Sequence, residues 1–270
     1  MTLFGFSLVS ALLAADHAYG VEPEPIVAAI AYTGNTPPDA LNDCETSAAS
    51  IIDEETCEVA ALVRDAASRG AQLIVVSESA FETESAEALP RQGRLPDPKS
   101  APVLSSMSNL ASDLEVYLAV PLHTEDYEGR PRSSLIAFGP TGRTVGIHHK
   151  VELYSTELDE FVPGERISTF ATPWGRVAMM LCSDVYAAPA LHMALARTGS
   201  DIVLLSSMWT VEGSTRWQST FAHDWGVYVV AANGAGGRGK GSGVYDRDGS
   251  PIQSDDSGLD TALVSSLRSR

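Results

Sequence analysis

The sequence has few basic residues and few cysteines, and after its N-terminus it has no apolar run long enough to span a membrane. Its 270 residues contain 18 Lys and Arg against 35 Asp and Glu, a formal net charge of −17 at pH 7. So acidic a surface repels phosphate backbones, which argues against a nucleic-acid partner. Because a membrane span needs about 20 mostly apolar residues in succession, we expect none beyond the N-terminus.

The composition is otherwise that of a folded chain. Apolar residues make up 44% and charged residues 20% of the sequence, which excludes a disordered chain. Segments with the periods of strands and helices alternate along it, and no repeat or low-complexity tract interrupts them. A chain of this length buries a sizeable core. We therefore expect residues 21–270 to form one α/β domain.

The first part of the chain has the pattern of an export signal. Residues 3–15 form an apolar stretch, and Ala18-Tyr19-Gly20 places small residues at the two positions that a signal peptidase reads. No Lys or Arg precedes the apolar stretch, which leaves a buried first helix as the alternative. We interpret residues 1–20 as a cleaved signal peptide, so the protein is expected to be secreted or periplasmic.

Three cysteines leave one over if two of them pair. Cys44 and Cys57 enclose a short polar segment, and in an oxidising compartment a disulfide between them would stabilise the fold by roughly 3 kcal/mol. Cys182 is then left over. A single remaining cysteine in an apolar strand is, taken alone, a core residue more often than a reactive one.

Three residues with useful chemistry stand at the ends of predicted strands. Glu78 and Cys182 each follow a short strand rich in Val, Ile, Leu or Met, and Lys150 follows a hairpin predicted over residues 133–148. The carboxyl ends of strands in open α/β sheets are where ligands bind. We therefore treat the three side chains as candidates for one site.

A thiol, a carboxylate and an ammonium brought together suit acyl transfer. The thiol of Cys182 is a nucleophile once deprotonated, and Glu78 can take that proton and later hand it to a leaving amine. Lys150 can stabilise both the thiolate and a developing oxyanion. Taken singly, the three residues have ordinary alternatives: Glu78 as a helix cap, Cys182 as a packed thiol and Lys150 as a surface charge. Jointly they predict catalysis.

The residues around this trio resemble the nitrilase, or carbon–nitrogen hydrolase, superfamily. The similarity is carried by their order and by the flanking segments His149-Lys150-Val151-Glu152-Leu153-Tyr154, Pro163-Gly164, Trp174-Gly175-Arg176 and Leu181-Cys182-Ser183-Asp184. The sequence is most similar to the vanin and biotinidase branch, through its export signal and the segments Ala188-Pro189-Ala190, Met208-Trp209 and Gly241-Ser242-Gly243-Val244-Tyr245. It departs from that branch at Ser77, where proline is usual, and at Ser183, where an aromatic residue is usual.

This resemblance implies a four-layer α-β-β-α sandwich of the nitrilase type and a homodimer. It adds Glu157 as a second glutamate that orients Lys150, with a solvated surface charge as the alternative. It also suggests that the backbone N–H of Ser183 joins Lys150 in holding the oxyanion. Trp209 is either a wall of the substrate pocket or ordinary core.

No cofactor is expected, and the resemblance implies hydrolysis without a metal. The Gly-rich segment 234–243 does not open a helix after a strand, so it is read as a loop and not as a dinucleotide site. No metal-ligand spacing relates the histidines His148, His149 and His223. The expected partner is a small-molecule amide.

The predicted function is hydrolysis of a small secondary, non-peptide amide, pantetheinase-like or biotinidase-like, through an acyl-thioester on Cys182. The acidic charge favours neutral or cationic substrates, although the groups around Lys150 leave room for one substrate carboxylate. Two alternatives stay open. One is attack on a nitrile or a carbamoyl compound by the same trio, and the other is a catalytically silent binding protein of the same fold, whose thiol would be unreactive.

We expect non-reducing mass spectrometry of the protein from its native compartment to show Cys44 linked to Cys57, with Cys182 as a free thiol. Reduction of this disulfide should lower the free energy of unfolding by roughly 3 kcal/mol, because it restores conformational freedom to the unfolded chain. Detection of both Cys44 and Cys57 as free thiols would contradict the prediction.

Overall fold

The computed structural model describes residues 24–32, 54–78, 80–81, 102–126, 128–186, 189–209, 213–234, 241–257 and 259–267. The predicted signal peptide, residues 1–20, and Cys44 lie outside these residues. Cys57 is disulfide-bonded, and Cys182 is a free cysteine. The pairing of Cys57 with Cys44 stays a prediction.

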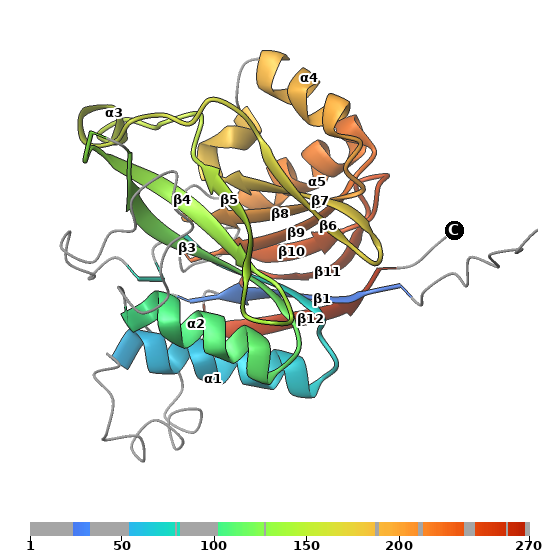
Figure 1. The fold of residues 1–270 in the computed structure, drawn as a ribbon. Helices are drawn as coiled ribbons and strands as arrows, with labels where there is room; N and C mark the ends of the chain where they lie inside the picture. The colour runs from blue at the N-terminus through green and yellow to red at the C-terminus, as the bar shows by residue number, and fades with distance from the viewer. Residues whose placement is uncertain are drawn as a thin grey trace, which may run out of the picture.

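The described strands form two six-stranded sheets (Figure 1). The first has the order β12-β1-β2-β3-β4-β5 and contains β1 (Ile26–Ala31), β2 (Leu73–Val76), β3 (Tyr117–Glu125), β4 (Pro131–Phe138), β5 (Thr144–His149) and β12 (Thr261–Ser266). The second has the order β11-β10-β9-β8-β7-β6 and contains β6 (Ser168–Thr172), β7 (Gly175–Leu181), β8 (Ile202–Ser207), β9 (Tyr228–Asn233), β10 (Ser242–Tyr245) and β11 (Pro251–Asp255).

Each sheet has a parallel centre and antiparallel margins. In the first, β2 runs parallel to β1 and β3, while β4, β5 and β12 pair antiparallel to their neighbours. In the second, β7, β8 and β9 are parallel, while β6, β10 and β11 are antiparallel. The carboxyl ends of β2 and β7 are therefore central positions of the two sheets, and both are followed by a candidate site residue.

Helices cover the outer face of each sheet (Figure 1). Helices α1 (Glu54–Ser68) and α2 (Pro102–Asp113) lie on the first sheet, and α4 (Pro189–Thr198) and α5 (Ser214–Trp225) lie on the second. Two shorter helices, α3 (Glu157–Glu160) and the 3-10 helix Cys182–Tyr186, follow strands β5 and β7. No helix within the described part of the chain is both long and apolar enough to cross a bilayer.

The central strands are buried on both faces, and their alternate residues face different layers. In β2, Leu73 and Val75 point into the core between the two sheets, whereas Ile74 and Val76 point into the core under α1 and α2. In β7, Met179 belongs to the core between the sheets and Met180 to the core under α4 and α5. The predicted four-layer α-β-β-α sandwich is confirmed.

Strands β6 and β11 are absent from the sequence-based prediction. Each lies at the edge of the second sheet, where one side of the strand has no neighbour. Their residues are mostly exposed or half-buried, and β11 begins with a proline. The apolar run or alternation that identifies a buried strand is therefore missing from both segments.

Candidate active site

Cys182 stands at a sharp turn. Strand β7 is buried and ends at Leu181, and the chain then enters the 3-10 helix with Cys182 at a φ of 39°. This left-handed conformation is unusual for a residue with a side chain and marks a backbone that its surroundings hold in place. The turn leaves Cys182 only partly buried, on the wall of a pocket.

Glu78 is placed by hydrogen bonds between its neighbours and the end of β1. The buried hydroxyl of Ser77 accepts the backbone N–H of Tyr32 at 3.0 Å, and the Ser77 N–H donates to the Ile30 carbonyl at 3.0 Å. Gly234 packs so closely here that an added Cβ would lie 2.8 Å from the Glu78 carbonyl oxygen. Ser77, where the resembled branch usually has proline, thus ties this segment to β1.

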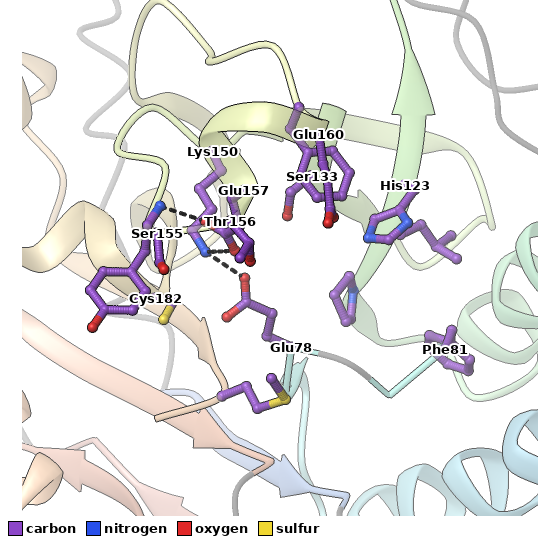
Figure 2. Close-up of a pocket in the computed structure, with 15 residues that line it drawn as sticks. Glu78, Phe81, His123, Ser133, Lys150, Ser155, Thr156, Glu157, Glu160 and Cys182 are labelled. Carbon is purple, nitrogen blue, oxygen red and sulfur yellow. Dashed lines mark hydrogen bonds and ion pairs between the residues drawn. The ribbon is translucent and has the colours of Figure 1, made fainter. Parts of the chain in front are cut away.

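Lys150 is buried and is paired with two carboxylates (Figure 2). Its side chain is 1% exposed, and its Nζ lies 2.9 Å from Oε1 of Glu78 and 2.6 Å from Oε1 of Glu157. The other oxygen of Glu157 accepts the backbone N–H of Tyr154 at 2.7 Å, which fixes α3 against the chain that follows Lys150. The structure thus brings Glu157 to Lys150 as the resemblance implies; that Glu157 orients the lysine for a reaction stays a prediction.

The ionisation of the trio follows from burial and mutual charge. Burial raises the pKa of the Glu78 carboxyl above its ordinary value, against the lowering effect of Lys150. Burial and the charge of Glu78 likewise raise the pKa of the Cys182 thiol, which hydrogen-bonds to Glu78. For Lys150, burial lowers the pKa, but Glu78, Cys182 and Glu157 outweigh it and hold the pKa above its usual value. At rest the site holds a charged ammonium and a protonated thiol.

Asp184 connects the segments that carry Cys182 and Lys150. Its fully buried carboxylate accepts the backbone N–H groups of Leu181, Val151 and Glu152, each at 2.9 Å, and lies 2.7 Å from Nε2 of the buried His148. A carboxylate that gathers four partners holds the two segments at a fixed separation. Asp184 therefore positions the Cys182 segment relative to the Lys150 segment.

A pocket of about 570 Å³ opens in front of the trio (Figure 2). Of the described residues, 15 line it. Glu78, Lys150, Cys182 and Glu157 lie on one part of its wall, and a further part is made by Phe81, Leu122, His123, Ser133, Glu160 and Phe161. The pocket is therefore large enough for a small molecule whose reacting carbon lies at the sulfur.

Two predicted substrate-binding residues, Ser183 and Trp209, are not among the described side chains that line this pocket. The Ser183 hydroxyl is buried and donates to the Glu152 carbonyl. Trp209 is 4% exposed and packs against the rings of Tyr186 and Trp217. The position of Trp209 is thus that of a core residue. Its neighbour in the sequence, Met208, lines the pocket. The oxyanion role of the Ser183 N–H stays a prediction.

Two of the histidines considered as metal ligands are engaged elsewhere. His148 pairs with Asp184, and Nδ1 of His149 lies 2.7 Å from the Ser134 hydroxyl. Burial lowers the pKa of His149 to about 4, so its ring is neutral near pH 7. No group of three or more His, Cys, Asp or Glu side chains within the described ranges is placed to hold a metal ion.

Sequence reasoning did not identify Asp184 and His148 as members of the site, nor Glu160 and Ser133 as part of the pocket wall. Asp184 stands two residues after Cys182 in the resembled motif, and a buried acid so close to the nucleophile was a usable signal. Glu160 lies one helical turn after Glu157, which places both on one side of a helix. Ser133 carries no comparable pattern.

Comparison with known proteins finds a matching family profile and several curated relatives. The family profile described as carbon-nitrogen hydrolase matches residues 49–265. A hydrolase of Schizosaccharomyces pombe is 25% identical over 166 residues, covering 58% of this chain and 51% of the relative. The omega-amidase NIT2 of Homo sapiens is 24% identical over 198 residues, covering 69% of this chain and 71% of the relative. The match to the first of these relatives thus spans about half of its length.

Solved structures share the fold at low sequence identity. Saccharomyces cerevisiae Nit3, described as a member of branch 10 of the nitrilase superfamily, superposes with a TM-score of 0.72 at 21% identity, covering 91% of this chain and 90% of that one. An amidase from Nesterenkonia sp. gives a TM-score of 0.70 at 20% identity, covering 91% of this chain and 90% of that one. At this identity the likeness concerns the fold.

Replacement of Asp184 by Asn should lower the free energy of unfolding by about 2 to 4 kcal/mol. One carboxylate oxygen becomes an NH2 group that faces N–H donors, and buried donors without an acceptor cost about 1 to 3 kcal/mol each. Urea denaturation followed by far-UV circular dichroism measures the change. The control is Asp113→Asn at the exposed end of α2, expected within about 0.5 kcal/mol of the parent. Equal free energies of unfolding for Asp184→Asn and Asp113→Asn would contradict the role of Asp184 in connecting the two segments.

Proposed function

Because the chain belongs to the carbon–nitrogen hydrolase family, we propose that it is an amidase that uses Cys182 as its nucleophile. One observation carries the proposal. Glu78 and Lys150, 72 residues apart in the sequence, meet at 2.9 Å, and Glu78 also hydrogen-bonds to Cys182. A base thus contacts both a cation and a thiol beside a pocket, which is the arrangement that thiol-dependent acyl transfer needs.

The thiol is activated during the attack and not before it. Because burial and Glu78 raise the pKa of Cys182, the resting sulfur keeps its proton. Glu78 accepts this proton as the sulfur bonds to the amide carbon. The negative charge of the Glu78 carboxylate thereby passes through the sulfur to the carbonyl oxygen of the substrate. The ammonium of Lys150 stays charged throughout, lies 2.9 Å from the Glu78 carboxylate and stabilises the negative charge that develops on the substrate oxygen.

The reaction then follows in two halves. Attack by sulfur converts the carbonyl to an oxyanion beside Lys150, and collapse of this intermediate breaks the carbon–nitrogen bond while Glu78 returns its proton to the departing amine. An acyl-thioester on Cys182 remains. Glu78 next takes a proton from water, the hydroxide attacks the thioester, and the carboxylic acid leaves as the sulfur regains its proton.

The substrate is a small amide, and two kinds are worth separating. The resemblance to the vanin and biotinidase branch favours a secondary amide, of the pantetheinase or biotinidase type. The similarity to proteins described as omega-amidases favours a second candidate, a primary amide. Either amide forms an acyl-thioester on Cys182 and releases ammonia or an amine. The same three residues therefore serve both kinds of substrate.

Export and dimerisation belong to the proposal as well. The disulfide bond at Cys57 supports an oxidising compartment, in agreement with the interpretation of residues 1–20 as a signal peptide. The exposed Tyr186 and Trp217, whose rings lie 4.7 Å apart, and the exposed Met193 on the neighbouring α4 support an interface between two copies. Light scattering coupled to size exclusion tests the dimer.

We expect Cys182→Ser and Glu78→Gln to lower amidase turnover by at least about a thousandfold while the circular dichroism spectrum stays unchanged. Lys150→Ala should lose activity equally, and its spectrum decides whether the fold survives the loss of the buried cation. Release of ammonia or amine is measured over a panel of primary amides, pantetheine, biotinyl-lysine, carbamoyl amino acids and aliphatic nitriles. The parental rate in Cys182→Ser would overturn the mechanism.

The same panel distinguishes the alternatives. Nitrile or carbamoyl turnover far above every amide would replace the amidase proposal with a nitrilase or carbamoylase. A silent binding protein would turn over none of these compounds, and its Cys182 would be inert to iodoacetamide in peptide mapping of the native protein. Preferential alkylation of Cys182 with amide turnover supports the proposal.

Replacement of Glu157 by Gln should move the acid limb of the kcat/KM profile to lower pH. The charge of Glu157 raises the pKa of Glu78, so its removal lets Glu78 lose its proton at lower pH. Since only ionised Glu78 accepts the thiol proton, activity then persists further into acid. The control is Glu165→Gln, an exposed carboxylate outside the pocket. An acid limb unmoved, or moved upward, in Glu157→Gln would contradict this coupling.

A further inference from the structure

The wall of the pocket has an excess of negative charge. Three carboxylates line it, those of Glu78, Glu157 and Glu160, and Lys150 is the only Lys or Arg among the described lining residues. Both close partners of the Lys150 ammonium are carboxylates, at 2.9 and 2.6 Å. The cation is therefore already neutralised, and a carboxylate on the substrate would meet net negative charge.

Glu160 is the carboxylate of this wall that has no partner. It is the last residue of α3, is exposed, and makes no hydrogen bond or ion pair with any described residue. In Figure 2, Glu160 lies on the far side of Glu78 from Cys182, on the same side as Ser133 and His123. A substrate whose amide carbon touches the sulfur would thus extend toward Glu160.

Ser133 supplies a second free group in the same part of the wall. Its side chain is buried, at 8% exposure, yet it lines the pocket, and its hydroxyl is not hydrogen-bonded within the described part of the chain. The backbone carbonyl of Ser133 accepts the Lys150 N–H at 2.9 Å, and Ser133 lies opposite His123 in the β3–β4 pair. A hydroxyl on the pocket wall without a protein partner is available to hydrogen-bond a ligand.

Apolar side chains form a further part of the pocket wall. Phe81, Leu122 and Phe161 line the pocket, and the ring of Phe161 packs 4.8 Å from that of His123. Such a surface favours methylene groups and contributes little to recognition of charge. The pocket therefore presents a reacting end at Cys182 and, away from it, a free carboxylate and a free hydroxyl that share the wall with apolar side chains.

We propose that Glu160 and Ser133 form a distal subsite for a protonated amine, so that the preferred substrates are small amides with an ammonium group joined to the amide by a short alkyl chain. This rests on the proposed amidase function and names its substrate class. Glu160 accepts a charge-assisted hydrogen bond from the ammonium, and the Ser133 hydroxyl accepts a second one. The free acidic side chain then serves to select cations over the isosteric neutral and anionic compounds.

The first experiment compares kcat/KM over amides of equal length that end in an ammonium, a methyl or a carboxylate group. We expect the ammonium compounds to be preferred over the methyl compounds roughly tenfold, the effect of one charge-assisted hydrogen bond at a partly exposed group, and the carboxylate compounds to be poorest. Glu160→Gln should remove most of this preference, so that the ratio of kcat/KM for the ammonium compounds over the methyl compounds falls toward one.

The matched control is Asp159→Asn. Asp159 is the exposed neighbour of Glu160 on α3 and does not line the pocket, so the variant changes the net charge equally. It should keep the ammonium preference. Equal losses in the two variants would attribute the preference to the overall negative charge and overturn the subsite. Ser133→Ala should weaken the ammonium compounds selectively, by a few-fold, and a uniform loss over all three series would remove Ser133 from the proposal.

A second measurement does not require turnover. Short alkyl amides that end in an ammonium group should protect Cys182 from alkylation by iodoacetamide better than the methyl compounds do, and Glu160→Gln should abolish the difference. Protection without hydrolysis of any amide supports the subsite and overturns the amidase proposal. Hydrolysis without preference or selective protection leaves the amidase proposal intact and overturns the subsite.

Discussion

The arrangement of the site depends on a buried cation. The side chain of Lys150 is 1% exposed, and a charge removed from water destabilises a protein unless opposite charges replace its hydration. Glu78, from the end of β2, and Glu157, from α3, both lie within 3 Å of its ammonium. The chain therefore buries Lys150 only when it also assembles the carboxylates around it. The geometry that stabilises the folded state and the geometry that the proposed reaction uses are the same.

The two sheets contribute different parts of this geometry, and their separation decides whether the parts meet. Glu78 and Lys150 follow strands of the first sheet, while Cys182 follows β7 of the second. The core between the sheets fixes the distance on the apolar side. Asp184 fixes it on the polar side, because it accepts N–H groups from the chain around β7 and from the chain after Lys150. The core between the sheets and the Asp184 carboxylate are thus two separate restraints on the distance between the Cys182 sulfur and the Lys150 ammonium.

The central strands, the main helices and the reacting trio were predictable because their signals are local. Runs of apolar residues mark the buried strands, and Glu78 and Cys182 stand where such runs end. The edge strands β6 and β11 lack the signal, since one side of each has no neighbour. The pairing of Asp184 with His148 spans 36 residues, and no periodicity encodes a side-chain contact between a strand of one sheet and a short helix that follows a strand of the other.

The net charge of the sequence restricts the charge of the substrate only in part. The excess of acidic residues argues for neutral or cationic substrates by long-range repulsion of anions, but it leaves room for one substrate carboxylate at Lys150. The structure argues against that possibility locally, because both close partners of the ammonium, Glu78 and Glu157, are themselves carboxylates. The residue that remains free in the pocket wall is itself an acid, Glu160. The long-range and the short-range fields of this protein therefore have the same sign at the pocket, and selection for a positive substrate group needs only the position of one glutamate relative to the sulfur.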